Sequence, residues 1–427
     1  MSAQGNPFRT LAHHRDLRLL FIAGVASDVG TWMQAVTVGT LVATTSRSAG
    51  ATALVMSVMF LPQGVCSPLG GLLADRYDRR RMAMVLLSFQ TVLAACLALL
   101  IRSGVTSALA LAGVILVQGC VNALAMPAMQ ALTPQLVPRE DLLSALSLGS
   151  ISWNSGRIFG PTLAAVCTAA FGSSTTVMMN AASFLVPIAA LASIRRPFHS
   201  GTHVAMRRFV TELKAGATLA RRTPSIRVLL PSAVVVQLML SSLLPAVPYY
   251  ARNVLHGSTA LVTVMFTACG AGAMLSAAFT PGLTLRLGRS RLARLSLGGL
   301  ISGVALAAVA HNAVFGTAAV ALYGAGLSGF FVSTGTVVQR DAPESHRGRL
   351  VSIYTAVVGM AYGIGAPLNG WIADRFWGFR THLLVWACVL AVAALAVQLR
   401  RPEWYGMLDG TDPEPRWRRT RALALDA

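Results

Sequence analysis

Residues 71–80, Gly71-Leu72-Leu73-Ala74-Asp75-Arg76-Tyr77-Asp78-Arg79-Arg80, place a dense cluster of charges between two long apolar runs. The whole chain is 55% hydrophobic and only 12% charged, whereas soluble globular proteins carry about 25% charged residues. In such a chain, small residues that lead into a compact charge cluster are typical of a short loop between two membrane helices. The stretch therefore predicts a helix–loop–helix hairpin at a membrane surface.

Apolar segments of this kind recur nearly end to end through the 427 residues. Many of them reach the roughly 20 residues that a membrane-spanning helix needs. A soluble protein would have to hide more apolar surface than one core holds. We therefore predict an all-α membrane protein with twelve spans, at 19–44, 51–74, 82–101, 107–131, 146–171, 175–194, 228–250, 259–283, 295–310, 313–338, 350–373 and 381–399.

The charges predict the orientation of these spans. The net charge is +20, and 29 of the 35 basic residues fall in alternate loops and the two ends of the chain, against five in the remaining loops. Basic loops stay on the cytoplasmic side of membranes. This rule predicts that both termini are cytoplasmic, and it accounts for the basic residues without a nucleic-acid partner.

The chain repeats internally at an offset of 205 residues, which relates Gly119 to Gly324 and Pro138 to Pro343. Parallel six-helix repeats of this kind form two bundles that rock about a central cavity. The expected organisation is a bundle at 1–194, a basic cytoplasmic linker at 195–227, a second bundle at 228–399 and a cytoplasmic tail at 400–427.

The twelve spans, the long central loop and the Gly-x-x-x-Asp-Arg-x-x-Arg-Arg pattern of residues 71–80 resemble the major facilitator superfamily. More narrowly, residues 31–34 (Thr-Trp-Met-Gln), 136–140 and 157–161 resemble the branch that contains enterobactin-type exporters and macrolide-efflux permeases. The resemblance implies a monomeric secondary transporter of a small molecule in the bacterial cytoplasmic (inner) membrane. It implies neither an enzyme nor a bound cofactor.

The gating motif in this resemblance comprises Gly71, Asp75, Arg76, Arg79 and Arg80. A small residue such as Gly71 lets two membrane helices approach closely. Asp75 is expected to pair with Arg79 or to face a helix N-terminus, where its charge is favoured; the resemblance implies the N-terminus of span 350–373 in an outward-facing state. The alternative is a topological loop without a gating role.

The corresponding loop of the second half, residues 282–291, carries Arg286 where Asp75 would fall. The acidic gate is therefore expected in the first half alone.

Residues 156–161 resemble an antiporter motif through Gly156, Gly160 and Pro161, with Arg157 inside the span. Close helix packing and a proline-induced kink are the mechanical expectation. The resemblance associates the motif with export, and a plain packing face is the alternative.

Asp28 is the only one of the fifteen acidic residues that falls inside a predicted span. A charge at membrane depth costs about 2.5–3.5 kcal/mol even on lenient scales, so such a group faces a cavity, pairs or changes protonation. We predict Asp28 as the proton-coupling group. The alternatives are a structural ion pair with Arg157 and a position near the outer interface; Arg157 itself is expected to meet Asp28, a backbone carbonyl or an anionic substrate group.

Polar and aromatic side chains of spans 1, 4, 7 and 10 are candidates for a substrate cavity, because those spans line the cavity in the family. They are Trp32, Gln34, Gln118, Asn122, Gln237 and Tyr323. Hydrogen bonds between packed helices are the alternative role for the polar members. One acid, one arginine and several amides favour an amphipathic organic molecule over a sugar or an inorganic anion.

No metal site is expected: His199 and His203 share a helical spacing but have no further ligand nearby. The function that these features favour is proton-coupled efflux of a hydrophobic or amphipathic small molecule, such as a drug, siderophore or natural product. A proton-coupled importer and a non-transporting membrane sensor are the alternatives.

Overall fold

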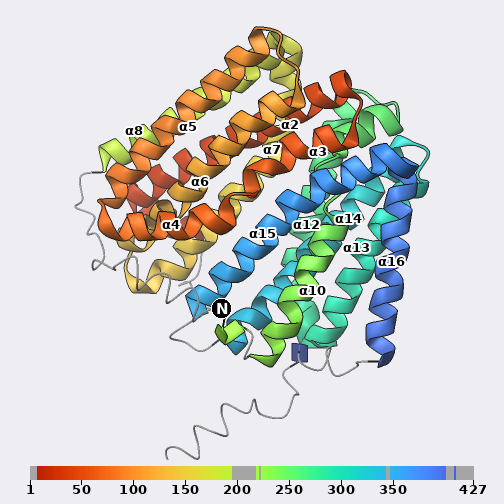
Figure 1. Ribbon diagram of the computed structural model, residues 1–427. Helices are drawn as coiled ribbons and strands as arrows, with labels where there is room; N and C mark the ends of the chain where they lie inside the picture. Colours follow the sequence, from red (N-terminus) through yellow and green to blue (C-terminus); the bar gives the residue numbers. More distant parts are fainter. Residues whose placement is uncertain (1–6, 195–217, 221–222, 343–346, 401–407, 410–427) are drawn as a thin grey trace, which may run out of the picture.

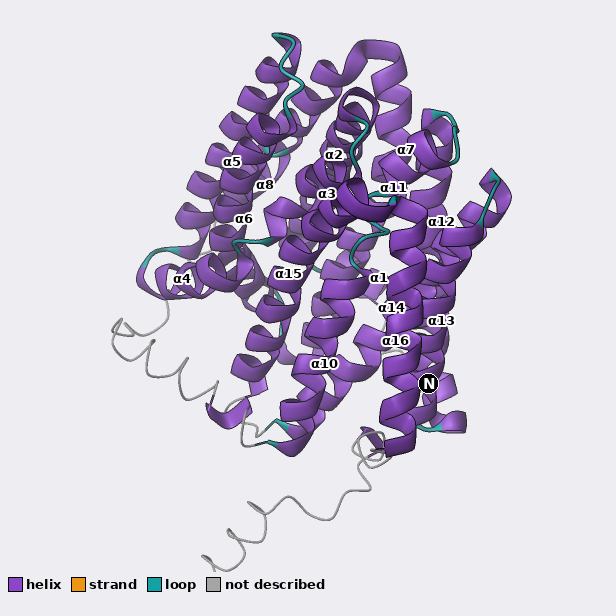
Figure 2. Cartoon of the chain, turned by 45° about the vertical axis from the view of Figure 1, so that its right-hand side comes forward, coloured by secondary structure: helices purple, strands orange, loops and turns teal. Residues whose placement is uncertain are grey.

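The computed structural model describes residues 7–194, 218–220, 223–342, 347–400 and 408–409. In this part of the chain the regular structure is helical, without strands, and the helices fall into two groups (Figures 1 and 2). The N-terminal half contains α1 (Pro7–His13), α2 (Arg15–Ser46), α3 (Ala49–Ser57), η2 (Val58–Phe60), α4 (Gln63–Arg76), α5 (Arg79–Arg102), α6 (Ala108–Leu136), η3 (Arg139–Asp141), α7 (Leu142–Ser183) and α8 (Leu185–Ser193). The C-terminal half contains α10 (Pro224–Leu240), α11 (Val247–Tyr249), the π-helix η4 (Tyr250–Val254), α12 (Thr259–Leu287), α13 (Arg289–Val309), α14 (Ala313–Asp341), α15 (Arg347–Ile372), the π-helix η6 (Ala373–Trp377) and α16 (Phe379–Arg400).

The twelve-span layout is confirmed. Among the described residues, 9 helical segments are long and apolar enough to cross a membrane. One of them, Ser144–Ser193, is 50 residues long and holds two spans, since about 20 residues suffice for one. The α10–α11 segment and α15 supply the remaining two.

The two spans of the Ser144–Ser193 segment meet at Gly172 of α7, whose φ of 83° and ψ of 165° break the helical backbone. A glycine is needed there because a side chain disfavours positive φ. Pro161 also lies within α7, but the residue with non-helical backbone angles is Gly172. The kink expected at Pro161 stays a prediction.

The span expected at 228–250 is interrupted, since α10 ends at Leu240 and helical structure resumes only at Val247. Such a break frees backbone carbonyls, which must find other donors inside a membrane. The Tyr323 hydroxyl donates to the carbonyl of Leu240 at 3.0 Å, and the Asn369 amide donates to the carbonyl of Leu238 at 2.5 Å. Side chains of α14 and α15 thus stabilise the interrupted span.

The halves meet near the loop between α2 and α3. The Asn253 amide donates to the carbonyl of Ala43 at 2.9 Å, and Gly50 packs against the backbone of Gly370. We call this side of the molecule the joined end and the side that carries residues 71–80 the opposite end. Figures 1 and 2 show α4 and α15 separating towards the opposite end.

A short piece of the C-terminal tail contacts the opposite end of the C-terminal half (dark blue in Figure 1). The side chain of Leu408 is buried with Leu229, Ala293 and Val337. The Asp409 carboxylate accepts a hydrogen bond of 2.9 Å from the backbone N–H of Ser290, at the start of α13. Burial opposes ionisation of Asp409, but its hydrogen bonds with Ser290 and Arg289 outweigh that effect and lower its pKa.

This contact has a counterpart in the first half, while the expectation that the acidic gate lies in the first half alone stays a prediction. In the first half Asp78 caps α5 from within the loop, accepting from the N–H of Arg81 at 2.7 Å. The N-cap of α13 is Gly288, which has no side chain to do this. The tail supplies the missing carboxylate through Asp409, and the sequence alone could not show that two segments so far apart meet.

Removing this contact should destabilise the protein. We expect a chain that stops after residue 407 to melt at a lower temperature than one that stops after residue 409. An N-cap is worth about 1 kcal/mol, and a buried leucine adds about 1.5–3 kcal/mol. Thermal unfolding of the two purified proteins in the same detergent measures the difference, and equal melting temperatures would show that the contact stabilises nothing.

Candidate functional site

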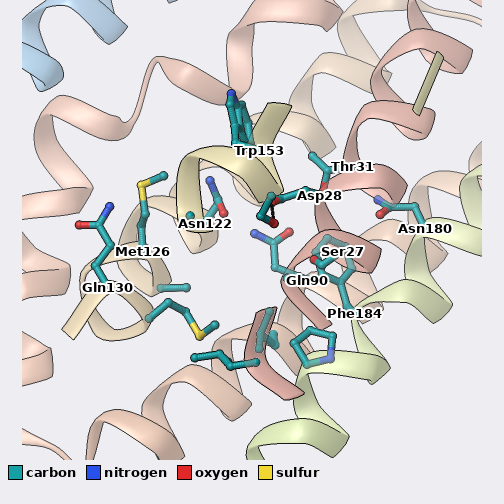
Figure 3. Close-up of a pocket in the computed structure, with 18 of the residues that line it drawn as sticks. Ser27, Asp28, Thr31, Gln90, Asn122, Met126, Gln130, Trp153, Asn180 and Phe184 are labelled. Atoms are coloured by element: carbon teal, nitrogen blue, oxygen red, sulfur yellow. Dashed lines mark hydrogen bonds between the residues drawn. The ribbon is translucent and has the colours of Figure 1, made fainter. Parts of the chain in front are cut away.

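A cavity of about 300 Å³ lies within the N-terminal half, among α2, α5, α6 and α7 (Figure 3). Its volume is at the lower limit of ligand pockets, which span roughly 300–1,000 Å³. In Figure 3 the side chains of Asp28, Gln90 and Asn122 converge on one space, flanked by Trp153 and Met126. The polar members of the lining are Ser27, Asp28, Thr31, Gln34, Gln90, Gln118, Asn122, Gln130, Thr133, Ser152 and Asn180.

Asp28 is the one acidic residue of this lining, which contains no basic residue. It is carried by α2 and accepts a hydrogen bond of 2.5 Å from the Ser152 hydroxyl of α7. A half-buried carboxylate with a single hydroxyl donor and access to a cavity is able to exchange a proton or meet a cation. The cavity therefore has one chemically active group on an otherwise uncharged wall.

A chain of amide hydrogen bonds fixes one side of the cavity. The Asn180 amide donates to Gln34 Oε1 at 2.8 Å, and the Gln34 amide donates to Gln118 Oε1 at 2.8 Å. The Gln90 amide donates to the backbone carbonyl of Gln118 at 2.9 Å. These bonds join four helices, so Gln34 and Gln118 hold the wall in place as well as facing the cavity.

Arg157 does not meet Asp28. Its guanidinium donates from Nη2 to the Cys269 thiol of α12 at 3.2 Å and lies 6.0 Å from the centroid of the Trp32 ring. Its Nε is buried without a hydrogen-bond partner. Of the alternatives stated for Arg157, the ion pair with Asp28 is absent from the structure, and the side chain lies at the contact between α7 and α12 instead.

Helices α2 and α7 cross closely where Asp28 and Trp32 of α2 face the glycines of the 156–161 motif. A Cβ atom added at Gly156 would lie 2.7 Å from the backbone carbonyl of Asp28, and one added at Gly160 would lie 2.5 Å from Trp32 Cβ. Glycines allow such close backbone approach. The next residue of the motif, Pro161, connects α7 to α12 of the other half: its carbonyl accepts a hydrogen bond from Thr263 at 3.1 Å.

The other predicted cavity residues are distributed differently. Asn122 lines the cavity, whereas Trp32 lines a smaller hollow of about 20 Å³ between the halves, where its ring meets Trp153 and Phe266 edge to face. Gln237 and Tyr323 are buried in the C-terminal half and are not part of the cavity lining. The Tyr323 hydroxyl donates its hydrogen bond to the carbonyl of Leu240.

The gating motif is partly as expected. Asp75 pairs with Arg79 at 3.3 Å, and Arg80 donates to the carbonyl of Ala192 at the end of α8 at 2.7 Å. The close approach expected at Gly71 is wrong: no atom lies within 4 Å of a Cβ placed there, whereas Gly70 packs against the backbone of Leu124 in α6. Asp75 and Arg76 end α4 on the side where α4 and α15 separate.

Sequence reasoning missed Gln90, Gln130, Ser152, Trp153 and Asn180 as cavity residues. Gln90 and Asn180 are amides inside the third and sixth spans, and intramembrane amides are a usable signal. Ser152 and Trp153 carried no comparable signal, because hydroxyl and aromatic residues are common in packed membrane helices. Three or more potential metal ligands do not cluster anywhere in the described residues, and His199 and His203 lie outside them.

A family model described as transmembrane secretion effector matches residues 6–425. An uncharacterized MFS-type transporter of Bacillus subtilis is 26% identical over 90% of this chain and 92% of its own length. An enterobactin exporter of Escherichia coli is 25% identical over 84% of this chain and 86% of its own length.

Among solved structures, a single-residue variant of the nucleoside transporter NupG superposes with a TM-score of 0.74 at 14% identity, covering 92% of this chain and 99% of that one. At this identity the likeness shows the fold alone. Two pseudo-symmetric six-helix bundles are the arrangement that the internal repeat predicted.

Proposed function

Because the chain belongs to the transmembrane secretion effector family of the major facilitator superfamily, and is thus a multi-pass membrane transporter and not an enzyme, we propose that it exports an amphipathic small molecule in exchange for protons. We place it in the bacterial cytoplasmic membrane, as a monomer with both termini in the cytoplasm. The 29-to-five distribution of basic residues supports this orientation. It makes the joined end extracellular and the opposite end cytoplasmic.

The observation that carries the proposal is the single carboxylate of Asp28 on the cavity wall. In the proposed cycle, a proton that enters from outside neutralises Asp28, and its release on the cytoplasmic side frees the carboxylate to attract the cargo. Proton and cargo then compete for one group, which couples their movements in opposite directions. Rocking of the two halves exposes the cavity to each side in turn.

The cavity wall also favours a class of cargo. A strongly anionic molecule would meet a carboxylate and no basic residue in this lining, while Arg157 is turned towards Cys269. Neutral or cationic molecules with apolar surface fit the remaining wall of amides, methionines and Trp153. This supports a drug or natural product over a polyanionic chelator, although one relative is named for enterobactin export.

Reconstituted vesicles test the direction and the coupling. With the protein inserted in known orientation and a pH gradient imposed, we expect an amphipathic cationic dye to move against the protons, out of the compartment that represents the cytoplasm. An anionic dye of similar size should move at least about tenfold more slowly, as expected for an unpaired charge beside a like charge. Cargo movement with the protons would make the protein an importer and overturn the export proposal.

A further inference from the structure

The carboxylate of Asp374 bridges the two halves at the joined end. It lies at the start of η6, directly after α15, and accepts three hydrogen bonds from the first residues of α3 and its cap. The Ser48 hydroxyl donates at 2.6 Å, and the backbone N–H groups of Ala49 and Gly50 each donate at 2.9 Å. A carboxylate at a helix N-terminus is favoured by the free N–H groups and by the helix dipole.

The backbones are in contact around this carboxylate. A Cβ placed on Gly50 would lie 2.7 Å from the amide nitrogen of Trp371, and one on Gly370 would lie 2.5 Å from the Cα of Gly50. The contact therefore belongs to the interface of the halves, and it must break if they separate at this end.

The residues that lead to Asp374 repeat the gating motif. Gly370-Trp371-Ile372-Ala373-Asp374-Arg375-Phe376 matches Gly71-Leu72-Leu73-Ala74-Asp75-Arg76-Tyr77 at an offset of 299 residues. Both stretches read glycine, two apolar residues, alanine, aspartate, arginine and an aromatic residue. Each of them ends a helix: Asp75 lies in the last turn of α4, and Asp374 follows α15.

The helices that end in these two stretches run in opposite directions. The α3–α4 segment starts at the joined end and finishes at the opposite end, whereas α15 starts at the opposite end and finishes at the joined end. The aspartate after α15 therefore meets the start of α3, and the aspartate in α4 is carried on the side where α15 starts. Asp75 is here bonded only to its own loop, at Arg79, among its described ion pairs.

We propose that Asp374 is a latch that holds the joined end shut while the cavity is accessible from the opposite end. This role rests on the alternating access of the proposed function. When the halves separate at the joined end, the three hydrogen bonds to residues 48–50 are lost, and the exposed N–H groups of α3 are left to water. Asp374 thus sets the population of the closed joined end and has no contact with the cavity.

Distances between spin labels at the joined end test the latch without cargo or a proton gradient. Labels on Ser103, after α5, and Val314, in α14, place one exposed probe on each half, in a chain whose six cysteines are replaced. We expect Asp374→Asn to lower the ratio of short to long distances about tenfold, since hydrogen bonds to a charged group are the strong ones. Ser48→Ala, which removes one of the three bonds, should shift the ratio in the same direction by less.

The matched control is Asp78→Ala, which removes an aspartate cap of the same kind within the N-terminal half. It should lower the melting temperature and leave the distance distribution unchanged. If Asp374→Asn and Ser48→Ala both leave the wild-type distribution in place, or if Asp78→Ala shifts it equally, the latch is overturned. If the wild type never shows a second distance when cargo and pH are varied, alternating access fails, which is a separate result.

Discussion

Asp28→Asn should abolish transport driven by a pH gradient. The amide keeps the size of the side chain and can still accept from Ser152, but it can neither bind nor release a proton. No other acidic residue lines the cavity to take over that role. We expect uptake into oriented vesicles to fall to the level of protein-free vesicles. Exchange of labelled for unlabelled cargo without a gradient should continue, but only at higher cargo concentrations, because the carboxylate no longer attracts the cargo.

The control for this prediction is Ser152→Ala, which removes the 2.5 Å hydrogen bond to Asp28 and keeps the carboxylate. That variant should remain coupled and show a changed pH dependence of uptake, because hydrogen bonds to a carboxylate favour its charged form. Full pH-driven uptake by Asp28→Asn would exclude Asp28 as the coupling group and would leave the transporter fold unaffected.

The fold was largely predictable because a membrane constrains helices more strongly than water does. Spans must be long and apolar, and basic loops mark one side, so most of the twelve segments were placed within a few residues. The failures occurred where tertiary contacts replace local ones. The span interrupted after Leu240 depends on hydrogen bonds that Tyr323 and Asn369 of other helices donate to its carbonyls. The sequence of residues 241–246 does not indicate which side chains donate them.

The site was less predictable for a similar reason. Asp28 was identifiable because a lone acid in a span is costly, but its partner depended on how α2 crosses α7. Sequence spacing left Arg157 as a possible partner, whereas in the structure Arg157 donates to Cys269 and Asp28 accepts from Ser152. Asp374 was overlooked because it falls just beyond a predicted span, where an acid appears to be an ordinary loop residue.

The crossing of α2 and α7 leads to the second large effect, expected for Gly156→Ala and Gly160→Ala. A methyl group at Gly156 would meet the carbonyl of Asp28 at 2.7 Å, and one at Gly160 would meet Trp32 Cβ at 2.5 Å. These neighbours are backbone and the inflexible first atom of a side chain, so the helices themselves must move apart. Overpacking of this kind costs about 1–3 kcal/mol per site, and it also displaces Asp28 from Ser152.

Gly113→Ala is the control, because Gly113 lies in helix α6 of the same half, outside the cavity lining, and no atom is within 4 Å of a Cβ placed there. Alanine is favoured over glycine in a helix by about 1 kcal/mol, so this variant should be at least as stable as the wild type. Melting temperature and pH-driven uptake should both fall for Gly156→Ala and Gly160→Ala, with the double variant losing transport entirely. If all three single variants behave alike, Gly156 and Gly160 have no special packing role, and the close crossing does not position Asp28.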